Sequence, residues 1–357
     1  MEKDLKGGIK MKFEKVLEKA GNDEITREEA LFLFQGATTY DRILELFKVA
    51  SKVREDEVGA TFKLDGFIGP INHCIANPPC RYCWNSSNLP EIKSGLEDVL
   101  TSDEISQSAR LMEETGTKAV ELGGASFTEE KLIIEAVEIF KSASDVDVWV
   151  KIGPGFSENG LRKLKEMSAS VAVPLEVLND ALFKKAKSGD NLGERERLLS
   201  KADDLGMGLA TVLLCGLGES REDRVNHLFY LKQFENFNYL LITCFRPIPG
   251  TPMSHYPLVS PLEGAITGAI ARLIFRNIDI HNGAYDQIPL CIMSGGNRLV
   301  HAGASVHRRS GVWRTLGAEV KHINDRLDFV NLLPSTVKFV TGAGMEVEPE
   351  IAGRWIK

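Results

Sequence analysis

The stretch ATFKLDGFIGPINHCIANPPCRYCWN, residues 60–85, joins a predicted strand directly to a loop that carries three cysteines. Its first nine residues are a β-rich run, which predicts a strand. The loop then places Cys74, Cys80 and Cys83 in a Cys-x5-Cys-x2-Cys pattern. Clustered cysteines in a reducing compartment indicate a metal rather than a disulfide. The stretch therefore predicts a metal site immediately after the first strand.

The rest of the chain alternates between short β-rich runs and amphipathic helical segments. The seven further strand candidates are KAVELGG (118–124), VDVWVKIG (146–153), SVAVPLEV (170–177), LATVLLCGLG (209–218), YLLITCF (239–245), NIDIHNG (277–283) and ASVHRR (304–309). The helix starts between them are predicted at Thr101 with Glu104, Ser126 with Glu129, Ser220 with Asp223, and Ser260 with Pro261 and Glu263. Eight strands separated by helices predict an α/β fold, a (β/α)8 TIM-type barrel over residues 59–312.

Two flanking segments complete the predicted organisation. Residues 1–58 form an N-terminal helical extension, with a capping box at Thr26 and Glu29 and a second helix opened by Thr39 or Asp41. Residues 313–357 have less regular spacing and are expected to close or cover the barrel.

Composition excludes several classes of function. The 357 residues include 43% hydrophobic and 26% charged residues, typical of a soluble globular protein with a sizeable core. A net charge of -7 argues against binding to nucleic acid or to an anionic membrane, because either requires a basic face. The sequence shows no apolar h-region at its N-terminus and no uncharged apolar run of membrane-spanning length, so a cytoplasmic location is expected.

Three thiolates on one loop can bind three corners of an iron–sulfur cubane and leave one iron open to a ligand. The alternatives are a structural zinc site, for which His73 is the obvious local fourth ligand, or incidental cysteines. The remaining cysteines, Cys215, Cys244 and Cys291, are scattered through apolar runs and are expected to be small buried hydrophobes.

The cysteine loop and the strand-end motifs resemble the radical SAM superfamily, in particular the branch of biotin synthase, the HydE maturase of diiron hydrogenase and methylornithine synthase. The usual spacing there is Cys-x3-Cys-x2-Cys. The longer first interval of this chain is similar to the HmdB family, associated with the cofactor of iron-only (methenyltetrahydromethanopterin) hydrogenase. The resemblance implies that Cys74, Cys80 and Cys83 hold a 4Fe-4S cluster, which reductively cleaves S-adenosylmethionine.

The resemblance also implies contacts to S-adenosylmethionine. It places Tyr82 near adenine, the glycines of VELGGAS at the methionine amino group, Glu176 near the ribose or amino group, and Arg195 at the carboxylate, with Arg197 as a competing assignment. Ala125 stands where relatives often carry an acid. The complete implied set is Tyr82, Gly123, Gly124, Glu176, Arg195, Gly216, Leu217 and Gly218.

Substrate contacts are expected from side chains that point into the barrel. Strand alternation suggests His281, Tyr285 and Asn282 after the seventh strand, and Lys151 and Arg246 are further polar candidates. The other five histidines belong to no recognisable group of functional residues and are expected to be structural. They are His227, His255, His301, His307 and His322.

The expected function is generation of a 5'-deoxyadenosyl radical that abstracts hydrogen from a small molecule. Resemblance to the HmdB family implies a role in biosynthesis of the iron-guanylylpyridinol cofactor. The implied partners are a small-molecule substrate, a low-potential electron donor and other cofactor-assembly proteins. One alternative is another reaction of the same branch, such as sulfur insertion or a carbon-skeleton rearrangement; another is a non-catalytic metal-binding scaffold.

Overall fold

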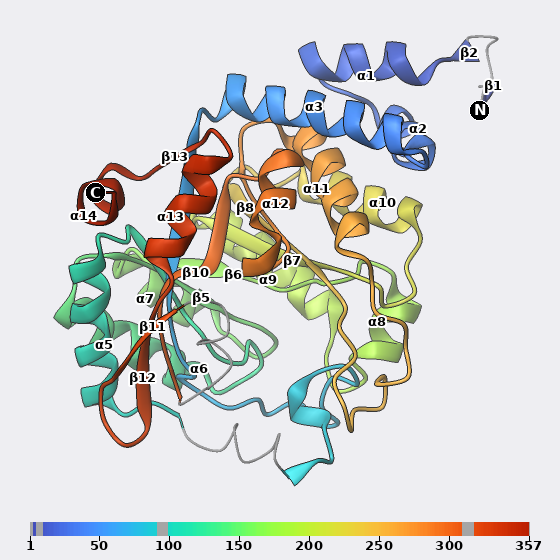
Figure 1. The fold of residues 1–357 in the computed structure, drawn as a ribbon. Coiled ribbons are helices and arrows are strands. Elements are labelled where there is room, and N and C mark those ends of the chain that lie inside the picture. Colours follow the sequence, from blue (N-terminus) through green and yellow to red (C-terminus); the bar gives the residue numbers. More distant parts are fainter. Residues whose placement is uncertain (1–2, 5–9, 91–98, 309–317, 357) are drawn as a thin grey trace.

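Eight parallel strands form a nearly closed barrel in the computed structural model, which describes residues 3–4, 10–90, 99–308 and 318–356 (Figure 1). The strands are β3 (Thr61–Ile68), β4 (Ala119–Leu122), β5 (Asp147–Lys151), β6 (Ser170–Ala172), β7 (Leu209–Cys215), β8 (Phe237–Cys244), β9 (Asp279–Asn282) and β10 (Arg298–Arg308). β3 to β9 pair in sequence order, and β10 pairs with β3. At the seam between β9 and β10, the Asn297 N–H donates to the Ile280 carbonyl at 3.0 Å. The predicted (β/α)8 barrel is confirmed.

Two predicted strands differ most from the structure in their bounds. The strand expected over 170–177 ends at Ala172, and only an isolated bridge between Glu176 and Leu213 continues the pairing. Pro174 lacks a backbone N–H, and Glu176 has a φ of 63°, so neither residue can continue a regular ladder. The last strand begins at Arg298, six residues before the prediction, and its register shifts between Val300 and Ser305.

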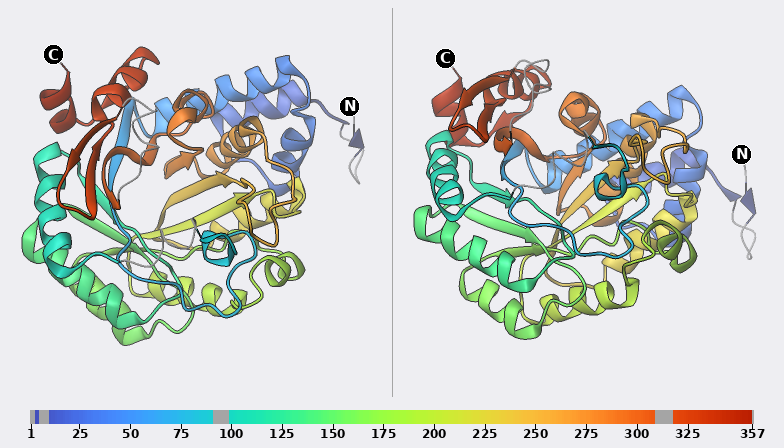
Figure 2. Two further views of the ribbon diagram at one scale, coloured as in Figure 1. Left: turned by 60° about the horizontal axis from the view of Figure 1, so that its bottom comes forward. Right: turned by 90° about the horizontal axis from the view of Figure 1, so that it is seen from below.

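Helices cover the outside of the barrel (Figure 2). They are α5 (Ser102–Thr115), α6 (Glu130–Ala143), α7 (Glu158–Glu166), α8 (Asp180–Ala186), α9 (Leu192–Asp204), α10 (Arg221–Leu231), α11 (Pro261–Phe275) and α12 (Ile288–Met293). The predicted caps at Thr101, Ser220 and Ser260 are confirmed. The start predicted at Ser126 is wrong: the N-cap of α6 is Glu129, and the Ser126 hydroxyl accepts a hydrogen bond from Arg195 instead.

Three N-terminal helices lie on one side of the barrel, where α2 and α3 pack against α10 and α11, and α1 packs on α2 and α3 (Figure 1). They are α1 (Phe13–Asn22), α2 (Arg27–Gly36) and α3 (Tyr40–Glu57), preceded by the short strands β1 (Lys3–Asp4) and β2 (Lys10–Met11). The capping box at Thr26 is confirmed, and Thr39, not Asp41, caps α3.

The C-terminal segment extends the sheet and then returns to the start of β3. It comprises β11 (Glu319–His322), β12 (Leu327–Asn331), α13 (Leu333–Gly342), β13 (Glu346–Val347) and α14 (Pro349–Trp355). β12 pairs antiparallel with β10, whereas β13 pairs with the first residues of β3. The Glu348 carboxylate accepts the Leu64 N–H at 3.1 Å. β13 and Glu348 therefore pack at the amino end of β3, whereas β12 lies beside the carboxyl-terminal half of β10.

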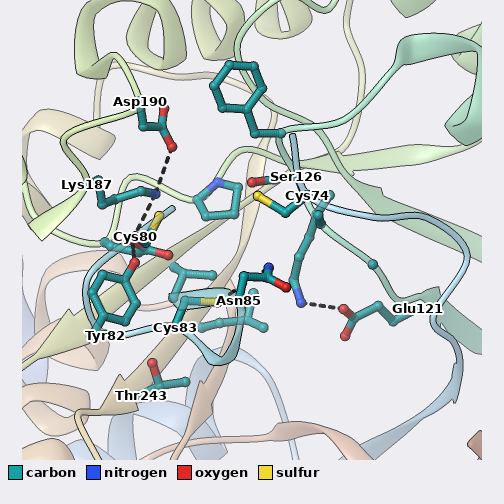
Figure 3. A pocket seen from close by; sticks show the side chains of 18 of the residues that line it. Cys74, Cys80, Tyr82, Cys83, Asn85, Glu121, Ser126, Lys187, Asp190 and Thr243 are labelled. Atoms are coloured by element: carbon teal, nitrogen blue, oxygen red, sulfur yellow. Dashed lines mark hydrogen bonds and ion pairs between the residues drawn. The ribbon is translucent and has the colours of Figure 1, made fainter. Parts of the chain in front are cut away.

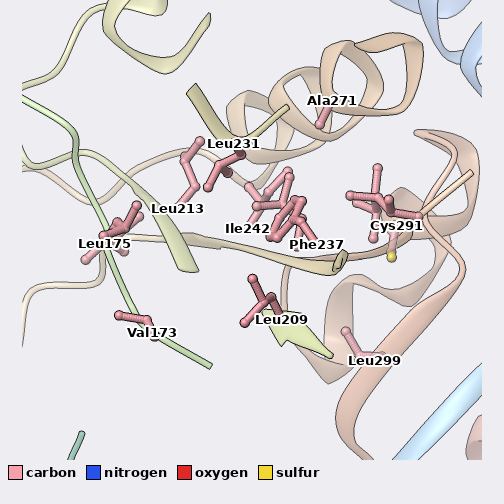
Figure 4. Close-up of a cluster of buried hydrophobic side chains, with 14 of the residues drawn as sticks. Val173, Leu175, Leu209, Leu213, Leu231, Phe237, Ile242, Ala271, Cys291 and Leu299 are labelled. Atoms are coloured by element: carbon pink, nitrogen blue, oxygen red, sulfur yellow. The ribbon is translucent and has the colours of Figure 1, made fainter. Parts of the chain in front are cut away.

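The apolar core lies mainly between the strands and the surrounding helices, where side chains such as Leu209, Leu213, Phe237 and Ile242 pack (Figure 4). A second, smaller cluster of buried side chains comprises Trp149, Ala172, Ala210, Tyr239, Leu241 and Val300.

A buried cation packs on the second cluster. The Arg298 guanidinium lies 4.2 Å from the Tyr239 ring centroid and pairs with Asp65 at 2.9 Å and Asp279 at 3.0 Å. Because Arg298 and Lys63 are register partners near the beginnings of their strands, these groups fill the amino end of the barrel. No helix in the described ranges is both long and apolar enough to span a bilayer.

Candidate active site

A cavity of about 730 Å³ opens at the carboxyl ends of the barrel strands (Figure 3). Most of the predicted site residues share its wall. These are Cys74, Cys80, Cys83, Tyr82, Gly124, Glu176, Arg195, Lys151, Arg246, His281 and Tyr285. Because parallel strands bring their carboxyl ends together, residues far apart in the sequence meet here.

The cysteine loop is tied by its backbone to the segments beside it. The Ile75 N–H donates to the Phe127 carbonyl at 2.9 Å, and the Arg81 N–H donates to the Ala186 carbonyl at 2.8 Å. Within the loop, the Cys83 N–H donates to the Cys80 carbonyl at 3.1 Å. Burial raises the pKa of Cys80 to about 12 and also raises the pKa of Cys83, so metal binding there must release protons.

The three cysteines of the loop all line the same cavity (Figure 3). Among the described residues, no group of three or more His, Cys, Asp or Glu is gathered as the ligands of one metal ion. Three thiolates are the ligand set that a 4Fe-4S cluster with one open iron takes, so the cluster assignment stays a prediction. His73, the fourth ligand in the zinc alternative, is exposed and lies outside the cavity wall, which gives that alternative no support.

A chain of charged side chains forms the wall beside Cys80. The Tyr82 hydroxyl donates to the Glu176 carboxylate, and the Lys187 ammonium lies 2.9 Å from the same carboxylate oxygen. Lys187 also lies 3.4 Å from Asp190, which pairs with Arg195 at 2.7 Å. Glu176 is therefore not a lone buried acid: the protein supplies both a hydroxyl and a cation to it. Sequence reasoning missed Lys187 and Asp190, whose only signal is the polar run KSGDN between two helices.

Two pKa shifts follow from this wall. Burial, followed by the charge of Glu176, raises the pKa of Tyr82 well above its ordinary value, so Tyr82 remains a hydrogen-bond donor. Burial alone would raise the pKa of Asp190, but hydrogen bonds from Arg195 and the charge of Lys187 outweigh it and lower that pKa. Asp190 is thus an ionised partner of both cations.

Arg195 is already engaged by the protein. Its Nε and Nη2 donate to the two oxygens of Asp190, Nη2 also donates to the Ser126 hydroxyl, and Nη1 donates to the Pro174 carbonyl. Its side chain is 1% exposed. The predicted approach of this guanidinium to a ligand carboxylate therefore competes with Asp190. The competing candidate Arg197 is exposed and does not line the cavity.

The glycine motifs have different positions. Gly124 lines the cavity, whereas Gly123 does not: a Cβ at Gly123 would overlap the Phe67 ring, so the ring occupies the room that a side chain would need. Gly216, Leu217 and Gly218 also lie outside the cavity wall. The Gly216 and Leu217 N–H groups both donate to the Glu219 carboxylate at 2.8 Å. Residues 216–218 thus form a turn that the Glu219 side chain stabilises.

The predicted substrate residues occupy the cavity wall except for one. Lys151 lies 2.5 Å from the Glu121 carboxylate, a buried partner that sequence reasoning missed. His281 accepts the Val300 N–H on Nδ1 at 3.2 Å, and its Nε2 lies 2.9 Å from the Gly283 carbonyl, which favours the neutral Nε2–H tautomer. The expectation for Asn282 is wrong. Strand alternation turns it outward, where it donates to Ser294 at 3.1 Å.

His227, His255 and His322, and the cysteines outside the loop, do not line the cavity. Burial lowers the pKa of His227 to about 4, His255 is exposed, and His322 pairs with Asp328. The side chains of His301 and His307 lie outside the described residues. Cys291 is buried as expected, and Cys215 is buried beside the partly exposed Cys244.

The fold and site together define a barrel enzyme with a cysteine loop at the carboxyl end of its strands. The profile of the radical SAM superfamily matches residues 68–231. An uncharacterized protein of Methanocaldococcus jannaschii is 39% identical over 262 residues, 72% of this chain and 69% of that protein. Biotin synthase of Endomicrobium trichonymphae is 25% identical, over 94% of this chain and 98% of its own.

The crystal structure of methylornithine synthase shares the fold. It superposes with a TM-score of 0.75 at 18% identity and covers 95% of this chain and 99% of its own. The chain belongs to the radical SAM superfamily, whose members are enzymes that use a 4Fe-4S cluster and S-adenosylmethionine.

Proposed function

We propose that Cys74, Cys80 and Cys83 hold the 4Fe-4S cluster and that the enzyme makes a 5'-deoxyadenosyl radical, which abstracts hydrogen from a small organic substrate. The observation that carries this proposal is that the three thiols line one cavity at the carboxyl end of the barrel. When bound, the cluster supplies the electron for reductive cleavage of S-adenosylmethionine. The open iron that this chemistry needs corresponds to the fourth corner, for which the loop offers no fourth cysteine.

The wall beside the cysteines suits a positively charged sulfonium ligand. Glu176 and Asp190 balance Lys187 and Arg195, so this wall carries no excess positive charge to repel the sulfonium. Tyr82 keeps its proton and its ring lines the cavity, where an aromatic face can pack on a nucleoside. Gly124 leaves its backbone accessible to the methionine end.

Tyr82, Gly124 and Glu176 are thus the proposed contacts to S-adenosylmethionine that the cavity supports most directly. Arg195 is proposed to contact the carboxylate only through the N–H that Asp190, Ser126 and Pro174 leave to it. Gly123 and residues 216–218 would act from outside the cavity wall, through the backbone. Lys151, Arg246, His281 and Tyr285 are proposed to meet the substrate.

Anaerobic reconstitution tests the cysteine assignment. With iron and sulfide, we expect about four irons per chain in the wild type and in a Cys291→Ala control, because Cys291 is buried outside the cavity. Dithionite and S-adenosylmethionine should then yield 5'-deoxyadenosine. A Cys80→Ala variant should form none. One tightly held zinc and no iron in the wild type would instead support the non-catalytic scaffold, and 5'-deoxyadenosine from Cys80→Ala would contradict the ligand assignment.

We further propose that the substrate is a precursor of the iron-guanylylpyridinol cofactor of iron-only hydrogenase. The support is the Cys-x5-Cys-x2-Cys spacing, similar to that of the HmdB family. Sulfur insertion of the biotin synthase type uses an auxiliary cluster. In the described part of the chain, Cys215, Cys244 and Cys291 do not line the cavity, which disfavours that alternative.

Deuterium transfer tests the substrate class. A pyridinol precursor deuterated at its carbon positions is incubated with the reconstituted enzyme, reductant and S-adenosylmethionine. We expect deuterium to appear in 5'-deoxyadenosine, because the radical abstracts a carbon-bound hydrogen from its substrate. If deuterium enters from no pyridinol position while unlabelled 5'-deoxyadenosine still forms, the cofactor role fails and the cluster assignment stands.

A further inference from the structure

Cys215 and Cys244 are direct neighbours although they are far apart in the sequence. They are the last residues of β7 and β8 and are register partners in the parallel ladder. Partner residues of neighbouring strands point their side chains to the same face and lie about 5 Å apart. This spacing is within the Cα separation of roughly 4.4–6.8 Å that a disulfide requires.

The pair lies on the outer face of the barrel, under α11. The Cys215 sulfur lies 3.7 Å from the Thr267 hydroxyl of this helix, and the Cys244 sulfur lies 3.8 Å from the Ser260 carbonyl at its N-cap. A Cβ at Gly264 would lie 2.6 Å from the Cys244 sulfur, so a glycine at this helical position leaves the room that the thiol occupies. Neither cysteine lines the cavity that holds the cluster cysteines.

The two thiols are not equivalent. Cys215 is fully buried, whereas Cys244 is partly exposed. Hydrogen bonding between the two thiols lowers the pKa of Cys244 and raises the pKa of Cys215 well above its ordinary value. The nearby guanidinium groups of Arg224 and Arg246 also lower the pKa of Cys244. Cys244 therefore has the properties of an attacking thiolate, and Cys215 those of a resolving thiol.

We propose that Cys215 and Cys244 form a second sulfur site, which reacts with small-molecule disulfides and closes to an intramolecular disulfide. The Cys244 thiolate attacks one sulfur of the disulfide RSSR, forms a mixed disulfide and releases RS⁻ as the first leaving group. Cys215 then loses its proton and attacks the Cys244 sulfur, which releases the second RS⁻. The protein thiols are oxidised by two electrons and RSSR is reduced to two thiols, so the exchange balances.

The position of the site connects it to the cavity. Cys215 directly precedes the turn at residues 216–218, and Cys244 lies two residues before Arg246, which lines the cavity. A covalent bond between the two strand ends would hold these two loops at a fixed separation. This inference does not depend on the substrate or on the role of the three cluster cysteines.

Peptide mapping of the reconstituted full-length protein tests the proposal. The protein is incubated anaerobically with oxidised glutathione, blocked with an alkylating reagent and digested with trypsin without reduction. Cys215 and Cys244 fall on the separate tryptic peptides 202–221 and 233–272, each with a single cysteine. We expect these two peptides to be joined, and dithiothreitol to separate them. In Cys215→Ala we expect glutathione to remain on Cys244, because no resolving thiol is left.

A kinetic measurement separates the site from general oxidation. Iodoacetamide should label Cys244 before Cys215 and before Cys291, whose pKa burial raises to about 12. Cys215→Ala should slow labelling of Cys244, because it removes the hydrogen bond that lowers the pKa of the Cys244 thiol. A Cys291→Ala control should leave the rate unchanged. The proposal is overturned if no joined peptide forms with oxidised glutathione, or if Cys244 labels at the same rate with and without Cys215.

Discussion

Replacing Lys187 with methionine removes the cation that lies between two carboxylates beside the cluster loop. The Lys187 ammonium lies 2.9 Å from Glu176 and 3.4 Å from Asp190, and its side chain is 3% exposed. At an effective dielectric constant of about 20, the attraction to Glu176 alone is roughly 6 kcal/mol before solvation is considered. Burying the ammonium costs several kcal/mol, so the net loss expected on breaking such a buried pair is about 3–5 kcal/mol.

The surroundings of Glu176 place the expected loss of unfolding free energy at the lower end of that range. Its side chain remains 15% exposed and keeps the hydrogen bond from Tyr82, so water and the phenol stabilise part of the uncompensated charge. Asp190 keeps its bidentate bond to Arg195. We therefore expect Lys187→Met to lower the free energy of unfolding by about 3 kcal/mol.

Urea unfolding of the wild type and matched variants measures this loss at neutral pH. The control is Lys184→Met, an exposed position of α8 three residues earlier, which should stay within about 0.5 kcal/mol of the wild type. The double variant Lys187→Met with Glu176→Gln should recover part of the loss, because it removes the unpaired charge. If Lys187→Met unfolds within about 1 kcal/mol of the wild type, the wall does not depend on this cation and the reasoning fails.

Three further predictions concern other parts of the barrel. Burial raises the pKa of Glu348 from 4.5 to about 7, so the neutral carboxyl group favours the folded state. As the pH rises from about 4.5 to 7, the free energy of unfolding of the wild type should therefore fall by roughly 3 kcal/mol relative to that of Glu348→Gln. Parallel pH profiles of the two proteins would contradict this prediction. Arg298→Met leaves Asp65 without its cation, whereas Asp279 keeps Lys63 at 2.9 Å; it should lower the free energy of unfolding by about 3–5 kcal/mol, partly restored by Asp65→Asn. Thr101→Ala removes a capping box and should cost about 1 kcal/mol in the same assay, whereas no loss would show that water replaces the cap.

The barrel was predictable because its signals are local. Each strand appears as a short β-rich run, and helix starts such as Thr101, Ser220 and Ser260 have a capping residue followed by its partner within three positions. The same rule failed at Ser126, since a hydroxyl that can cap a helix can equally accept a hydrogen bond from Arg195, 69 residues away. Local pattern does not reveal such a distant competitor.

The cysteine set was predictable because one loop carries all its members, whereas the charged partners were not. Glu121 and Lys151 come from neighbouring strands, and Lys187 reaches Glu176 from the segment after α8. The sequence shows each of these charges but not which other charge it meets. Asn282 illustrates a different difficulty. Strand alternation turns only one of two adjacent polar residues into the cavity, and here this residue is His281. The sequence alone does not give the register, and a shift of one position would turn Asn282 inward instead.

The pairing of charges also changes how the cavity can recognise a ligand. The resemblance implies that the Arg195 guanidinium is available to a ligand carboxylate, but Asp190 already accepts two of its hydrogen bonds. A ligand carboxylate that displaced Asp190 would leave that acid 1% exposed with Lys187 as its remaining cation. Breaking such a pair is costly. Arg195 therefore holds Ser126 and Pro174 in place by hydrogen bonds as much as it offers a hydrogen-bond donor to a ligand. Recognition at this wall therefore depends on Lys187 staying in place, because it is the cation that both acids share.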